Sequence, residues 1–346
     1  MRVAVVCPYG LEVPGGVQNQ AVSLVEWLRA EGDDAWVVAP GSGGPDGTRH
    51  VGATTTVPAN RSRARLALDP RVVGRVGAAI SDAEIVHIHE PFQPMVSLGA
   101  LMSGGPPKVG TFHADPGGGV RTAYAAGGLL LRSWARRLAV ATAVSPVAQR
   151  GVASICTTRI IPNAIDVAAF AVDEPRIAGR VAFLGRDEPR KGLDVLLDAW
   201  PLAIEHEPDA ELVVIGAERG QAPRGVEFRP DVTDEEKRRL LASSSIVCTP
   251  NLGGESFGIT LVEAMAAGCA VVASAIPAFV AVVGEAGVLV APGDAFGLGT
   301  SLGELLADSD RVDALADAGR TRAMAFDTAE VFPRYRDAYY EALSGV

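Results

Sequence analysis

The chain lacks a basic excess, a cysteine framework and a long apolar run, and each absence excludes a class of protein. It has 31 lysines and arginines against 41 acidic residues, so no basic surplus exists to displace counterions from a nucleic acid. No apolar stretch reaches the ~18 residues of a membrane span, and the N-terminal run is shorter than the core of a signal peptide. The four cysteines are scattered without a C-x-x-C pair, which predicts core residues in a reducing compartment. We therefore expect a soluble, cytoplasmic protein with no nucleic-acid partner.

Short, uninterrupted apolar runs alternate with helical patterns, and this series begins twice. The first series predicts a helix at 18–31 and strands at 3–7, 34–40, 84–89, 108–113, 138–145 and 158–163. The second predicts strands at 180–186, 211–217, 226–232, 245–250, 270–274 and 288–294, with helices from 192 and at 234–244, 257–267, 297–307 and 333–343. Uninterrupted runs are typical of parallel strands covered on both faces. The chain is thus an α/β protein with two Rossmann-like, doubly wound domains, predicted at 1–165 and 166–329.

Ligands of such domains bind beyond the carboxyl ends of the strands, so the post-strand loops are the candidate sites. The loop after the first strand, PYGLEVPGGVQNQ, carries Gly15 and Gly16 just before a helix. A glycine pair there lets backbone approach a ligand and leaves N–H groups at the helix start, although an ordinary turn explains it equally well. The dinucleotide fingerprint G-x-G-x-x-G is absent, which disfavours a dehydrogenase.

Three histidines lie near strand ends in the first half. His113 ends the run KVGTFH and could donate a hydrogen bond to a substrate hydroxyl, while a structural role is the alternative. His87 and His89 are two residues apart and should share one face of a strand. Without a third ligand at metal spacing, we expect core roles for this pair and no metal site.

Charged residues cluster after two strands of the second half. Arg186 ends a strand, and Arg190 with Lys191 immediately precedes a helix, an arrangement that favours a diphosphate. The segment GGESFGITLVE (253–263) places Glu255 in a glycine loop and Glu263 eight residues later, with Ser256 as the expected helix cap. Carboxylates accept hydrogen bonds from hydroxyls, so the two acids suit a sugar on one side of that phosphate and a ribose on the other.

These segments together resemble the GT-B-fold retaining glycosyltransferases of family GT4. The stretches RVAVVCPYGLEVPGGVQ, VHIHEP, TFH, IPNAIDVAAFA, FLGRDEPRKG and LGGESFGITLVEAMAAG are most similar to the actinobacterial phosphatidyl-myo-inositol mannosyltransferases. The resemblance implies two domains facing each other across a cleft, with a last helix, 330–346, that crosses back onto the first domain. It also implies retention of anomeric configuration and no requirement for a metal or other cofactor.

The resemblance assigns donor-binding residues. Arg186 and Lys191 would hold the diphosphate, Glu255 the sugar hydroxyls and Glu263 the ribose. Backbone N–H groups facing sugar and phosphate would come from Phe257, Gly258 and Ile259. Positions around the guanine would be Val232, Asp234 and Lys237. Gly16 would approach the diphosphate, and His113 would touch the donor sugar near the reacting carbon. The implied catalytic set is His113, Arg186, Lys191 and Glu255, and the implied acceptor pocket is formed by Tyr9, Gly15 and Gln18.

The implied donor is GDP-mannose or another nucleotide sugar, and the implied acceptor is a phosphatidylinositol-type lipid at the inner membrane face. Peripheral membrane contact would use a basic patch of Arg61, Arg63, Arg65, Arg71 and Arg75, although solvated surface charge explains the first three equally well. The chain departs from the family in RDEPRK, one residue shorter, in the glycine run 117–119, and in the few basic residues of 69–80.

Three alternatives stay open. One is a family member acting on a soluble acceptor, such as a secondary metabolite or an inositol phosphate. Another is a non-catalytic nucleotide-sugar-binding paralogue, which the presence of Arg186, Lys191, Glu255 and Glu263 disfavours. The third is a UDP-sugar epimerase, which would not explain the loop PYG…PGGVQ.

Overall fold

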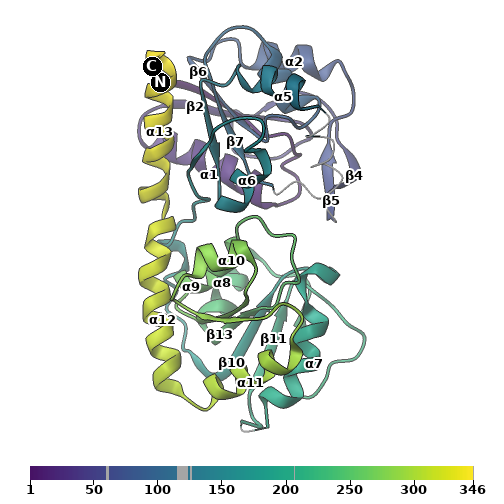
Figure 1. The fold of residues 1–346 in the computed structure, drawn as a ribbon, viewed down its shortest axis with the longest axis vertical. Helices are drawn as coiled ribbons and strands as arrows, with labels where there is room; N and C mark the ends of the chain where they lie inside the picture. The colour runs from purple at the N-terminus through teal and green to yellow at the C-terminus, as the bar shows by residue number, and fades with distance from the viewer. Residues whose placement is uncertain (60–61, 115–123, 125–126, 206, 346) are drawn as a thin grey trace. The chain divides into compact units, whose positions relative to one another are not determined.

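The computed structural model describes residues 1–59, 62–114, 124, 127–205 and 207–345. The contacts among these residues divide the chain into two compact units, Met1–Ala164 with Val331–Val346, and Ile165–Glu330. Each unit is built around a parallel sheet flanked by helices (Figure 1). The predicted fold class, two doubly wound α/β domains, is confirmed.

The first sheet has the order β3-β2-β1-β6-β7-β8-β9, with every pair parallel. Its strands are β1 (Arg2–Val6), β2 (Asp34–Ala39), β3 (Arg49–His50), β6 (Ile85–His89), β7 (Lys108–Phe112), β8 (Val140–Ala143) and β9 (Arg159–Ile160). Its helices include α1 (Gly16–Ala30), α2 (Val72–Ala79), α3 (Val96–Met102), α5 (Gly128–Ala135) and α6 (Pro146–Val152). From β1 the chain adds β2 and β3 on one side and then β6 to β9 on the other, so the strand order reverses between β1 and β6. In such sheets, ligands bind beyond the carboxyl ends of the strands at this point.

Helix α1 buries the apolar stripe that the sequence periodicity predicted. Its buried residues include Ala21, Leu24, Val25 and Leu28, the i, i+3, i+4, i+7 stripe of the predicted helix. An antiparallel hairpin, β4 (Thr55–Ala59) and β5 (Ser62–Leu66), and the two-residue β3 were not predicted. Their sequences are polar or interrupted by proline, so they carry no continuous apolar run of the kind that indicates a buried strand.

The last helix, α13 (Thr328–Ser344), packs its aromatic face into the core of the first unit. Phe332, Tyr335 and Tyr339 are each at most 3% exposed. The Phe332 ring meets the Trp27 ring of α1 edge-on with centroids 5.8 Å apart. The guanidinium of Arg336 lies 4.6 Å from the centre of the same indole. The C-terminal segment is therefore part of the first unit although it follows the second in sequence.

The second sheet has the order β12-β11-β10-β13-β14-β15, again all parallel. Its strands are β10 (Ile177–Leu184), β11 (Glu211–Ile215), β12 (Val226–Arg229), β13 (Ser244–Thr249), β14 (Ala270–Ser274) and β15 (Val288–Val290). Its helices are α7 (Leu193–Ala203), α8 (Asp234–Ala242), α9 (Ile259–Ala266), α10 (Pro277–Val283), α11 (Ala295–Leu306) and α12 (Ser309–Ala323). Helix α12 was not predicted, because its buried face consists largely of small residues, Val312, Ala316, Gly319 and Ala323, which give a weak apolar signal.

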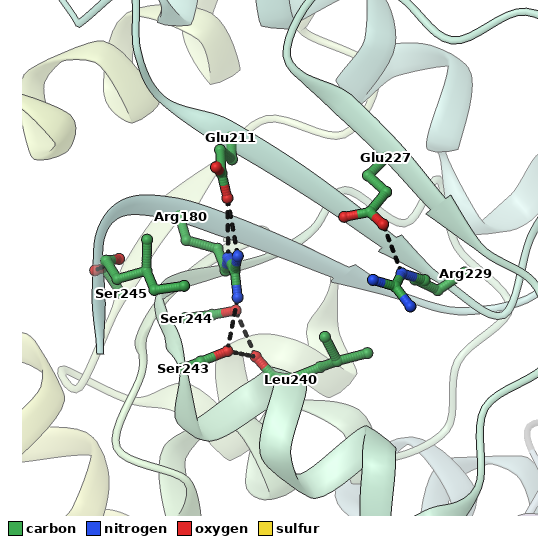
Figure 2. A network of polar contacts seen from close by, with 9 residues as sticks. Arg180, Glu211, Glu227, Arg229, Leu240, Ser243, Ser244 and Ser245 are labelled. Atoms are coloured by element: carbon green, nitrogen blue, oxygen red, sulfur yellow. Dashed lines mark hydrogen bonds and ion pairs between the residues drawn. The ribbon is translucent and has the colours of Figure 1, made fainter. Parts of the chain in front are cut away.

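A polar network closes the amino end of the second sheet (Figure 2). Arg180 on β10 donates from Nε and Nη2 to Glu211 on β11, at 3.2 and 2.9 Å, and from Nη1 to the Ser243 hydroxyl at 3.0 Å. The hydroxyls of Ser243 and Ser244 in turn donate to the Leu240 carbonyl. These contacts hold the amino ends of β10, β11 and β13 together. The candidate site lies beyond the carboxyl ends of β10 and β13, at the opposite edge of the sheet.

We predict that Phe332→Ala destabilises the first unit far more than Tyr340→Ala does. Phe332 is 1% exposed, whereas Tyr340 on the same helix is 56% exposed. Removing the buried ring should lower the free energy of unfolding by about 3–5 kcal/mol, and removing the exposed ring by at most about 0.5 kcal/mol. Urea denaturation followed by circular dichroism measures both. Equal losses in the two variants would contradict the packing of α13.

Candidate functional site

The candidate site of the second unit lies at the switch point of its sheet. Strands β10 and β13 are adjacent and parallel, and both end at this edge. The loop after β10 carries Arg186, Arg190 and Lys191, and the loop after β13 carries Asn251 and Glu255. Neighbouring parallel strands deliver these two loops to the same place, as the sequence predicted for post-strand segments.

One carboxylate oxygen organises the two loops. Oε1 of Glu255 accepts hydrogen bonds from Lys191 Nζ at 2.6 Å, Arg190 Nη1 at 2.7 Å and Asn251 Nδ2 at 3.0 Å. The side chains of Glu255, Arg190 and Lys191 are 14–17% exposed, so these ion pairs are shielded from water on most sides. Two cations thus share one shielded carboxylate, and Arg190 also pairs with Glu188 at 2.7 Å, so the site is a compact cluster of hydrogen-bonded charges.

Backbone contacts hold the loops in register. The Leu252 N–H donates to the Arg190 carbonyl at 2.8 Å. Gly192 follows the short 3-10 turn Pro189–Lys191 with φ +72°, and a Cβ atom there would lie 2.0 Å from the Pro250 carbonyl oxygen. Only glycine fits this approach, which brings Lys191 close enough to reach Glu255.

The structure places the two arginines of the β10 loop differently. Arg190, which the resemblance did not name, bonds both Glu255 and Glu188 and is 14% exposed. Arg186 is 64% exposed, and its Nη2 lies 3.4 Å from Glu188 Oε1. Lys191 and Glu255 are therefore in direct contact, whereas Arg186 contacts Glu188. Asn251 was also missed, and its only signal in the sequence was a polar side chain directly after a buried strand.

The start of α9 corrects one prediction. The helix begins at Ile259 with Gly258 in the N-cap position, two residues after Ser256, which the sequence suggested for that position. Gly258 has φ +115°, and a Cβ atom there would lie 2.9 Å from the Phe279 ring. Phe257 is 6% exposed and meets the Phe326 ring edge-on at 5.5 Å. The side chain of Phe257 is thus in the core, and only its backbone can serve a ligand.

A second charged group forms where α8 meets α9. Lys237 Nζ lies 2.9 Å from Glu263 Oε1 and 3.3 Å from Asp234 Oδ1, and 5.9 Å from the centre of the Phe170 ring. Burial alone would lower the pKa of Lys237, but the carboxylates of Glu263 and Asp234 outweigh it and raise that pKa. Of the residues predicted near the base and ribose, the structure unites these three, and Val232 lies at the start of the same segment, before α8.

In the first unit, the loop after β1 is tied to the start of α1. Gln18 Nε2 donates to the carbonyls of Gly10 at 3.4 Å and Val13 at 3.2 Å. Gly15 is the extended N-cap residue of α1, which begins at Gly16, and as a glycine it provides no side-chain cap. Tyr9 pairs with Leu66 at the end of β5, and burial raises the pKa of its phenol.

The arginines predicted as a membrane patch have different surroundings. Arg65 Nε lies 2.9 Å from Glu12 Oε1, so this side chain is paired within the protein. Arg71 and Arg75 are exposed at the start and in the middle of α2. Arg61 and the side chain of Arg63 lie outside the described residues, as do Asp115 and the glycine run 117–119.

His113 lies at the end of β7 and is only 7% exposed. Its Nε2 is 2.7 Å from Nδ1 of His89. Glu90, at φ +49°, accepts the backbone N–H groups of His113 and Ala114 through Oε1, both at 2.7 Å. Burial lowers the pKa of His113 to about 3. The imidazole is therefore neutral near pH 7 and can act as a hydrogen-bond donor rather than as a cation.

Two further findings concern the described residues alone. None of their helices combines the length and apolarity needed to cross a membrane. Within the same ranges, no group of three or more histidine, cysteine, aspartate or glutamate side chains is arranged to hold a metal ion.

Comparison with known proteins agrees with this architecture. Residues 14–169 match the domain described as Glycosyltransferase Family 4, and residues 178–308 match Glycosyl transferases group 1. Phosphatidyl-myo-inositol mannosyltransferase of Mycobacterium leprae is 36% identical over 98% of this chain and 96% of its own, and that of Mycolicibacterium smegmatis is 37% identical over 100% and 95%. The GDP-mannose:cellobiosyl-diphosphopolyprenol alpha-mannosyltransferase of Xanthomonas campestris is 29% identical over 85% and 82%.

Solved structures support the fold. Sucrose-phosphate synthase from Thermosynechococcus elongatus superimposes with a TM-score of 0.75 at 19% identity, covering 100% of both chains. The fold and these matches together define a GT-B glycosyltransferase. Within that class, the chain belongs to the phosphatidyl-myo-inositol mannosyltransferases of glycosyltransferase family 4.

The buried histidines predict how the stability of the first unit depends on pH. Burial lowers the pKa of His87 from 6.5 to about 3, so the unfolded chain binds a proton before the folded one as the pH falls. The stabilisation is complete above pH 6.5 and is lost towards pH 3, by about 1.4 kcal/mol per pH unit for one such group. We expect His87→Phe to reduce the slope of unfolding free energy against pH between about pH 6 and 5. Urea titrations at these pH values measure it, and identical slopes in variant and wild type would contradict the assignment.

Proposed function

We propose that this protein transfers a mannosyl residue from GDP-mannose to a phosphatidyl-myo-inositol acceptor, with retention of anomeric configuration. The observation that carries the proposal is the 36–40% identity to enzymes named phosphatidyl-myo-inositol mannosyltransferase over 84–100% of the chain. The charged cluster at Glu255 supports it, because its chemistry fits a sugar linked to a diphosphate.

In this proposal, Arg190 and Lys191 bind the donor diphosphate. Their charges, with the N–H groups at the start of α9, stabilise the negative charge that develops on the departing nucleoside diphosphate. Glu255 holds the two cations in place before the donor binds. When the diphosphate takes over part of their hydrogen bonding, the carboxylate can accept hydrogen bonds from hydroxyls of the transferred sugar. Arg186 is assigned to the outer side of the same diphosphate, and no step requires a metal.

The nucleoside is assigned to the second charged group. Glu263 accepts hydrogen bonds from ribose hydroxyls, and its ion pair with Lys237 fixes the carboxylate for that task. The segment Val232–Lys237 is assigned to the guanine. A guanine nucleotide is favoured by the 29% identity to an enzyme whose name specifies GDP-mannose.

The acceptor is assigned to the first unit. Tyr9, Gly15 and Gln18 lie in the loop after β1 and at the start of α1, and they are proposed to contact the inositol headgroup. His113 is proposed to donate a hydrogen bond to the transferred sugar, which a neutral imidazole can do. The exposed Arg71 and Arg75 of α2 are proposed to contact anionic lipid at the membrane surface.

We expect the purified enzyme to consume GDP-mannose in preference to UDP-glucose and UDP-N-acetylglucosamine and to mannosylate phosphatidylinositol. Mass spectrometry of products with phosphatidylinositol liposomes, or with soluble inositol phosphates, measures donor and acceptor together. Glu255→Ala should lower kcat on the order of 100-fold or more, because the cations and the sugar both lose their partner. Glu285→Ala, an exposed glutamate of the same unit, is the matched control and should retain activity.

Each arm of this experiment has a contradicting result. Turnover of UDP-sugars alone would refute the guanine donor. Mannosylation of soluble acceptors but not of liposomes would replace the lipid by a soluble acceptor. A Glu255→Ala variant with near-normal transfer would show that the cluster is not the donor site.

A further inference from the structure

A buried chain of aromatic side chains leads from the C-terminal helix to His113. Strand β6 points His87 and His89 to the same face, and their rings stack with centroids 4.6 Å apart at 19°. The Tyr339 hydroxyl oxygen of α13 lies 2.7 Å from His87 Nδ1, and the Thr111 Oγ1 of β7 lies 2.7 Å from His87 Nε2. Because both of its nitrogens are engaged, the His87 ring is held in one orientation, and it supports the face of His89.

The contact between His89 and His113 determines where their protons lie. Burial lowers the pKa of each imidazole far enough that both are neutral near pH 7, so each ring carries one proton. His89 Nδ1 and His113 Nε2 are 2.7 Å apart, and one of them must donate to the other. Among the described residues, the buried Nε2 of His89 has no hydrogen-bond partner.

Two tautomer arrangements are conceivable, and burial separates them. If His113 donated, the proton of His89 would sit on Nε2 as a buried N–H without a described acceptor. If His89 donates from Nδ1, its Nε2 is left with only a lone pair. Unpaired buried N–H groups are rarer in proteins than under-used acceptors, so the second arrangement is favoured.

We propose that His89 is a positioning residue for His113, donating from Nδ1 to His113 Nε2. This bond fixes the plane of the His113 ring and leaves its proton on Nδ1 as a donor. Asn163 interacts with this imidazole, and a substrate oxygen that accepts from Nδ1 would compete with that side chain. The adjacent Glu90 fixes the backbone of His113 through its two N–H acceptor contacts, so consecutive residues of one strand end hold both ring and main chain. The functional part of the inference rests on the proposed role of His113 in transfer.

Two substitutions at His89 separate positioning from packing. In His89→Asn the side-chain amide nitrogen stands where Nδ1 stood and can still donate to His113. In His89→Leu the volume is similar but the donor is gone. We expect His89→Leu to lower kcat on the order of 100-fold with donor KM close to wild type, because a misplaced catalytic group affects the chemical step. His89→Asn should recover most of this kcat.

A control variant, histidine spectra and thermal unfolding accompany these two substitutions. His50→Leu, an exposed histidine of the same unit, should leave kcat unchanged. Long-range ¹H–¹⁵N correlation spectra of histidine-labelled enzyme, assigned with the variants, should show His113 protonated on Nδ1 and bare on Nε2. Thermal unfolding of His89→Asn and His89→Leu should establish that both are folded before their rates are compared.

The possible results separate the positioning role of His89 from the proposed role of His113. Equal loss of kcat in His89→Asn and His89→Leu, unchanged kcat in both, or a proton on His113 Nε2 would overturn the inference. Normal transfer by His113→Ala would instead refute the proposed role of His113, and with it the functional part of this inference. The tautomer of His113 would still be decided independently by the spectra.

Discussion

The contact between the loops after β10 and β13 depends on one carboxylate oxygen that accepts three hydrogen bonds. Oε1 of Glu255 receives Lys191, Arg190 and Asn251, which come from the loops after two adjacent strands. Removing one partner from such a shielded ion pair costs about 3–5 kcal/mol, because the charges left behind remain partly desolvated. The same contacts hold two cations close together, which water-exposed side chains would not do unaided. The loop structure and the clustering of the two cations therefore have a common physical origin, and the close approach of Gly192 to the Pro250 carbonyl lets the two loops meet.

The candidate groups of the first unit are held in place by a different kind of interaction. Its candidate groups are neutral imidazoles in the core, and their order comes from burial and directional hydrogen bonds rather than from charge. Helix α13 takes part, because Tyr339 contacts His87 and the aromatic face of the helix completes the core. The C-terminal segment, distant in sequence, thus contacts β6, whose last residue, His89, lies 2.7 Å from His113. The first unit thus carries neutral, hydrogen-bonding groups at its candidate site, whereas the second carries a cluster of charged side chains.

Much of this arrangement follows from the sequence, and the exceptions have physical reasons. Uninterrupted apolar runs predicted the parallel strands, and the rule that ligands bind at their carboxyl ends selected the loops after β10 and β13, whose charged side chains are in contact. Helix α12 escaped because small residues form its buried stripe. Spacing could not tell which arginine before Lys191 turns towards Glu255, since a 3-10 turn sets that direction. The contact between His89 and His113 depends on the register of β6 against β7, which no single-strand pattern encodes.

The central claim is that the cations held by Glu255 form the diphosphate site, and calorimetric titration of GDP tests it most directly. Lys191→Met should weaken GDP binding about 10- to 100-fold, the effect of losing a charged hydrogen bond. Glu255→Gln should bind GDP at least as tightly as wild type, because the carboxylate that competes with the diphosphate for Arg190 and Lys191 has been neutralised. Unchanged GDP affinity in Lys191→Met, or weakening by Glu255→Gln as large as that in Lys191→Met, would contradict the account.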